Sequence, residues 1–78
     1  MFTRKLGPSA PAALCSGGHS CPEIIEMESG DFAVIGSDIT DLAVGKLPPG
    51  CGCGPAERVI RIPRQVLVLA RADIPNAV

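Results

Sequence analysis

The sequence predicts a small α+β domain, namely a three-stranded antiparallel β-meander with a C-terminal helix and many loops. The first observation is the segment EIIEMESGDFAVIGS at residues 23–37, which has the pattern of a β-hairpin. The second is the run ERVIRI at residues 57–62, which predicts a third strand. The third is the segment that follows Pro63, in which apolar residues recur at helical spacing.

The hairpin is the clearest of these elements. Apolar residues alternate with glutamates over residues 25–28, so we expect Ile25 and Met27 to face a core. Gly30 suits the turn, because glycine adopts the positive φ that tight hairpins require. The return strand, residues 32–35, is apolar on both faces, which favours a central position in the sheet.

Two helical segments are expected around the third strand. Residues 38–45 predict one or two helical turns that Asp38 would cap and Gly45 would end. The last segment, residues 63–74, contains a VLVLA run that would also serve as a buried strand. We predict a helix there, because Pro63 suits the first helical position.

The domain organisation follows from composition. Residues 1–14 are rich in Gly, Pro, Ser and Ala and lack periodicity, so we expect a flexible arm before a single domain at residues 15–78. Two phenylalanines are the only aromatic residues, and the core must be built from Ile, Val, Leu and Ala. Folds this small have thin cores and often add a disulfide, a metal ion or a partner chain.

Charge and hydropathy exclude several classes. A net charge of −1 argues against a dedicated nucleic-acid-binding protein. Six acids and no base lie within residues 23–41, whereas four arginines and no acid lie within residues 58–71. We expect these groups to pair within the fold, although they could also orient a partner or a second copy. No run approaches the ~18 apolar residues of a membrane helix, and no signal peptide precedes the domain, which predicts a cytoplasmic protein with reduced thiols.

All cysteines and the single histidine lie in the stretches CSGGHSC and CGCG. The candidate metal ligands are Cys15, His19, Cys21, Cys51 and Cys53. Four of these five could hold one structural Zn²⁺ and fasten the arm to the loop near residue 50. The spacing departs from the C-x2–4-C knuckles of zinc ribbons, and disulfides and free thiols remain as alternatives.

The remaining patterns favour an interaction protein over an enzyme. A cysteine nucleophile requires an activating base held by a third group, and the loop around His19 offers no such group. We therefore predict no catalytic residue and no small-molecule substrate. The candidate partner-binding residues are Val59, Arg61, Arg64 and Val68. The alternative is a small thiol- or zinc-dependent enzyme or a metal carrier.

Two resemblances carry this further. The motifs CPE, GDFAVIG and RIPR, within residues 21–75, are similar to those of a group of short, uncharacterised actinobacterial proteins. The order of the CPE strand, the FAV strand followed by Ser37-Asp38, and the segment 59–70 also resembles the small domain that accompanies WhiJ-type helix-turn-helix regulators, although the tryptophan of that family's last helix is missing here. This second likeness implies a non-enzymatic accessory protein that binds a transcriptional regulator, or a copy of itself, and does not bind DNA directly.

Overall fold

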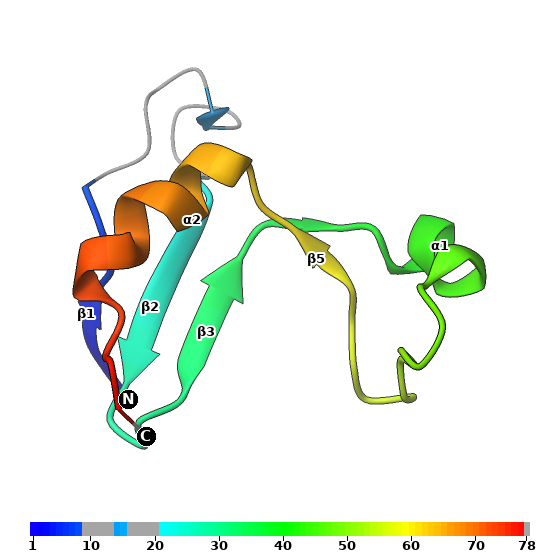
Figure 1. The fold of residues 1–78 in the computed structure, drawn as a ribbon, viewed down its shortest axis with the longest axis horizontal. Coiled ribbons are helices and arrows are strands. Elements are labelled where there is room, and N and C mark those ends of the chain that lie inside the picture. The colour runs from blue at the N-terminus through cyan, green and yellow to red at the C-terminus, as the bar shows by residue number, and fades with distance from the viewer. Residues whose placement is uncertain (9–13, 16–20, 78) are drawn as a thin grey trace.

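A three-stranded antiparallel sheet forms the body of the molecule in a computed structural model that describes residues 1–8, 14–15 and 21–77 (Figure 1). Its strands are β1 (Phe2–Lys5), β2 (Glu23–Met27) and β3 (Phe32–Ile35), with β2 in the centre. Helix α2 (Arg64–Ala70) and the following 3-10 turn η3 (Arg71–Asp73) lie across one face of this sheet (Figure 1). The predicted α+β class, with a three-stranded antiparallel sheet and a C-terminal helix, is thus confirmed, but the third strand of the sheet is β1 and not the predicted run at residues 57–62.

Strand β1 lies where we expected a loose arm. Arg4 is paired with Glu26 and Lys5 with Ile25, and the Leu6 N–H donates a hydrogen bond to the Ile24 carbonyl at 2.8 Å. The expectation of a loose arm is therefore wrong for residues 2–8. Residues 2–5 form a strand because the backbone N–H and C=O groups along one edge of β2 are available to pair with theirs. Residues 9–13 lie outside the described part of the chain.

The hairpin of β2 and β3 has the bounds that the sequence predicts. Gly30 has a φ of 93°, and its N–H donates to the Met27 carbonyl at 2.9 Å, which closes the turn. The expected central position of β3 is wrong, because β1 occupies the far side of β2 and no described strand pairs with the outer edge of β3.

Residues 37–62 leave the sheet as a projecting arm (Figure 1). Its elements are β4 (Ser37–Asp38), α1 (Thr40–Ala43), the 3-10 turn η2 (Val44–Lys46) and β5 (Ile60–Arg61). The strand predicted at residues 57–62 is thus reduced to two residues, which pair with β4 and not with the main sheet. The cause lies at Gly36, where the chain turns away from β3 and packs against the returning segment.

The core is as thin as the length suggests. The buried hydrophobic side chains of the described residues are Leu6, Ile24 and Ala70, against which Ile62 and Val66 pack in part. These residues come from the end of β1, from β2, from α2 and from the end of the projecting arm. A core of this size stabilises the chain only modestly. Many of the large apolar side chains remain exposed at the surface.

Candidate interaction surface and cysteine loops

The strand register assigns each residue of the sheet to one of two faces. Directly opposed residues of an antiparallel pair project from the same face. Ile24 is buried beneath α2 and is opposed to Val34, so both belong to the face that α2 covers, which we call the covered face. Neighbouring residues along each strand project from the other face. That open face carries the apolar residues Phe2, Ile25, Met27, Ala33 and Ile35, together with two charged residues, Lys5 opposite Ile25 and Glu23 opposite Ile35.

This assignment reverses the expected orientation of β2. We predicted that Ile25 and Met27 would face the core and that Glu26 would point to solvent. Instead, Glu26 lies on the covered face, because a carboxylate there finds partners on β1. Ile25 and Met27 project from the open face and are only partly shielded by their neighbours.

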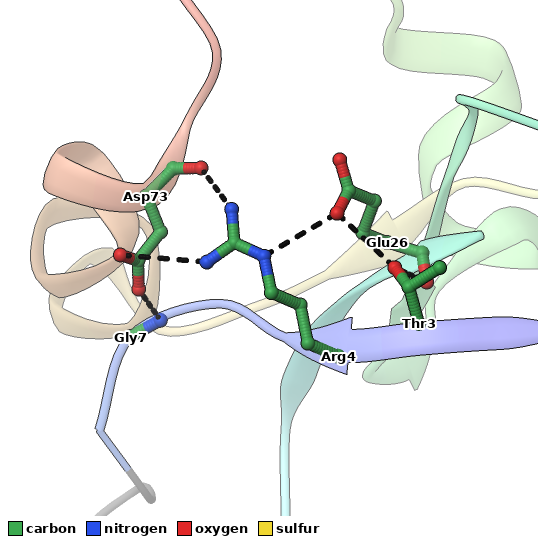
Figure 2. A network of polar contacts seen from close by, with 5 residues as sticks. All are labelled: Thr3, Arg4, Gly7, Glu26 and Asp73. Atoms are coloured by element: carbon green, nitrogen blue, oxygen red, sulfur yellow. Dashed lines mark hydrogen bonds and ion pairs between the residues drawn. The ribbon is translucent and has the colours of Figure 1, made fainter. Parts of the chain in front are cut away.

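The partners of Glu26 form a network that ties β1 to the end of α2 (Figure 2). The Arg4 Nε lies 3.3 Å from the Glu26 Oε1, and the Thr3 hydroxyl donates to the same oxygen at 3.1 Å. Arg4 also donates to the Asp73 carbonyl at 3.0 Å, while the Asp73 carboxylate accepts the Gly7 N–H at 2.7 Å. The charges of the covered face are therefore paired with one another.

The apolar residues of the open face are left uncovered by the described helices. Phe2 and Ile35 are each 50% exposed. They lie at diagonal corners, since Phe2 is opposed to Met27 and Ile35 to Glu23 at the other end of β2. The apolar surface therefore spans the sheet. Two signals in the sequence could have indicated a second apolar face of the sheet. One is the alternation of apolar residues and glutamates over residues 25–28, and the other is that residues 32–35 are apolar on both faces.

The outer side of α2 is also apolar, but it is interrupted by charge. Leu67 is 53% and Val68 46% exposed. Arg64 and Arg71, both exposed, lie three or four positions from each of them and are therefore their neighbours on the helix surface. This surface is less suited to an apolar partner than the open face.

The four predicted partner-binding residues are distributed over two parts of the molecule. Val59 lies in the projecting arm, half-buried, with its N–H donating to the Thr40 hydroxyl at 2.8 Å. Arg61 is an exposed residue of β5, while Arg64 and Val68 are exposed on α2.

The cysteines divide into two separate pairs. Cys15 and Cys21 are joined by a disulfide. Their sulfurs are therefore not thiolates in this state and cannot serve as zinc ligands. His19, the predicted imidazole ligand between them, lies outside the described residues.

Cys51 and Cys53 are free thiols of the projecting arm. The Cys53 thiol donates to the Glu57 carbonyl at 3.2 Å, and the Glu57 carboxylate accepts the Gly54 N–H at 2.7 Å. Both cysteines line a shallow, open hollow together with Leu47 and Arg58. Among the described residues, no group of three or more His, Cys, Asp or Glu side chains is placed to hold a metal ion.

Asp38 organises the base of the projecting arm. One carboxylate oxygen accepts hydrogen bonds from the Thr40 hydroxyl at 2.6 Å and the Thr40 N–H at 3.0 Å, and the other pairs with Arg58 at 2.9 Å. The hydrogen bonds from Thr40, followed by the contact with Arg58, lower the pKa of Asp38 from 3.8 to about 2. The sequence predicted Asp38 as the helix cap, but Ile39 occupies the N-cap position of α1. Asp38 instead accepts the N–H of Thr40, the first residue of the helix, from its place in β4.

Comparisons with family models, curated proteins and solved structures find no significant match to this chain. Within the described residues, no helix has the length and apolar character required to cross a bilayer.

Proposed function

We propose that the protein is a small, non-enzymatic interaction protein whose partner covers the open face of its sheet. The observation that supports this is the apolar surface formed by residues of all three strands and left uncovered by the described helices. Contiguous exposed apolar surface of this kind marks interaction sites. Burying the exposed half of Phe2 or Ile35 would stabilise a complex by about 1 kcal/mol each.

The charges support a protein partner bound through apolar contact. Arg4, Glu26 and Asp73 pair with one another on the covered face, so these three charges do not lie on the open face. The open face carries one charge of each sign, Lys5 and Glu23, beside its apolar residues. The likeness to the accessory domain of WhiJ-type regulators suggests a helix-turn-helix regulator or a second copy as the partner class.

Photo-crosslinking tests this proposal with the two aromatic residues of the chain. Phe2 lies on the open face, whereas Phe32 is opposed to Glu26 and lies on the covered face with similar exposure, 50% against 43%. Each is replaced in turn by p-benzoylphenylalanine in the producing cell, and adducts are identified by mass spectrometry. We expect an adduct with a defined protein at position 2 and little at position 32. No adduct at position 2, or equal yields at both positions, would contradict the proposal.

A structural zinc ion remains part of the proposal as the alternative to the disulfide. In the cytoplasm, where we place the protein, Cys15 and Cys21 would be kept as thiols and would become available as ligands together with His19, Cys51 and Cys53. Zinc content and free thiols are measured on protein purified without added metal. About one zinc per chain, with thiols protected until chelation, supports the zinc site. No zinc and two free thiols support the disulfide form.

A further inference from the structure

We infer that the partner on the open face is a second copy of this chain, packed sheet against sheet. This inference rests on the proposed function and names the occupant of the same surface. Three features of the chain support it: the area that it exposes, the alternation of its central strand, and the distribution of its charges.

The exposed area is larger than a compact monomer requires. The chain exposes 5925 Å². A compact monomeric protein of its mass, 8.0 kDa, exposes about 4,450 Å², so the excess is about 1,500 Å². A stable homodimer removes about 800 to 1,000 Å² or more from each subunit. This excess, to which the projecting arm also contributes, is larger than the area that such an interface removes.

The shape of the chain agrees with this area. Its radius of gyration is 13.8 Å, whereas a compact domain of 78 residues has a value of about 11.5 Å. The projecting arm accounts for part of the difference (Figure 1). An extended chain of this size that buries three hydrophobic side chains gains more from association than a compact one would.

The alternation of β2 indicates a second buried face. Ile25 and Met27 alternate with Glu26 and Glu28, which is the pattern of a strand with one face away from water. Within a single chain, the face that bears Ile25 and Met27 is the uncovered one. Packing against a second sheet would bury Ile25 and Met27 between the two sheets. The ion pair of Glu26 with Arg4 on the covered face would not be disturbed.

The open face is also the surface that can best meet its own copy. A two-fold interface is formed by the same patch on both subunits, so the patch must be complementary to itself. The five apolar residues of the open face meet this condition, and its two charged residues, Lys5 and Glu23, have opposite signs and leave the face without net charge. The outer side of α2 does not meet the condition, because Arg64 and Arg71 of one copy would approach those of the other.

Sedimentation velocity from about 5 to about 500 μM, with substitutions on both surfaces, tests the inference. Ile35→Glu changes the open face, and Leu67→Glu is the matched control on α2, with 50% and 53% exposure. We expect wild type to sediment as a dimer of twice 8.0 kDa, and Ile35→Glu to raise the dissociation constant at least about tenfold. We expect Leu67→Glu to leave the dissociation constant unchanged. Phe2→Lys provides a second open-face variant should circular dichroism show that Ile35→Glu has not folded.

Two results would overturn the inference. One is a wild-type chain that remains monomeric over the whole range, and the other is a dimer that Leu67→Glu disrupts while Ile35→Glu and Phe2→Lys do not. The crosslink at position 2 then separates the two proposals. An adduct with a different protein would leave the proposed function standing and exclude only self-association, whereas the absence of any adduct would exclude both.

Discussion

Individual carboxylates hold the ends of this small fold together. Asp38 fastens the base of the projecting arm and Asp73 joins the end of α2 to β1. Both were visible in the sequence as acids, and Asp38 was expected to cap a helix. Their partners could not be predicted, because Arg58 and Gly7 lie 20 and 66 residues away along the chain.

Asp38 should make stability depend on pH in a defined window. Its pKa is about 2 in the fold against an ordinary value of 3.8, so its stabilising contribution is fully present above about pH 4 and is lost as the pH falls through 2. Asp38→Asn should remove this part of the pH dependence. Urea unfolding between pH 7 and pH 2 measures it, with Asp31→Asn as the control because no hydrogen bond of the described residues involves the Asp31 carboxylate. Parallel curves for wild type and Asp38→Asn would contradict this assignment.

Asp73→Ala should destabilise the chain by about 1–3 kcal/mol, because the part-buried Gly7 N–H would lose its acceptor and Arg4 would lose an ionic partner. The free energy of unfolding in urea measures this change. Glu28→Gln is the control: Glu28 pairs with the amino terminus at an exposed site, where an ion pair contributes little. Equal effects of the two substitutions would show that the network in Figure 2 is not stabilising.

At the scale of elements, Gly36 decides where the sheet ends. A Cβ at this position would collide with the Arg61 carbonyl oxygen and would lie 2.9 Å from the Cγ2 atoms of Ile60 and Ile62. The chain that leaves β3 at Gly36 and the chain that returns at residues 60–62 are in close contact. This contact keeps β5 paired with β4 and away from the main sheet.

Gly36→Ala should therefore destabilise the protein by about 1–3 kcal/mol, since the backbone of residue 61 must move to accommodate the methyl group. Gly45→Ala is the matched control: a methyl group there would meet no atom within 4 Å, and the φ of Gly45 is not positive. We expect this control to be neutral or slightly stabilising. Thermal unfolding of both variants provides the comparison, and a neutral Gly36→Ala would refute the packing argument.

The elements that the sequence predicts correctly are those with local causes. The hairpin depends on a glycine turn between two adjacent strands, and α2 on a proline at its start and helical spacing after it. β1 and the short β5 depend on partners far along the chain, and so their positions could not be derived from local pattern. The same holds for the faces of β2, because the location of α2 determines which of Ile24 and Ile25 is buried.

At the scale of the whole molecule, the body and the projecting arm should differ in local stability. Thr40, which is 7% exposed, is the one buried residue of the projecting arm, residues 37–62, whereas the body contains the hydrophobic core. Regions with little buried apolar contact open at low free-energy cost.

Hydrogen exchange followed by mass spectrometry should therefore show faster exchange in α1 and the loop to Val59 than in β2 and α2. The amides of β2 are the internal reference, because this strand is paired on both sides. Uniform protection across the arm and the body would indicate that the arm is held by contacts stronger than those described.

The placement of the core has a consequence for the order in which the molecule can be made. Leu6 and Ala70 belong to one hydrophobic cluster yet lie at nearly opposite ends of the chain. Synthesis proceeds at about 5–20 residues per second, so the first strand waits about 3–13 seconds for the helix that covers it. During this interval the hairpin has both apolar faces in water. Folding of the body is therefore completed only after α2 has been synthesised.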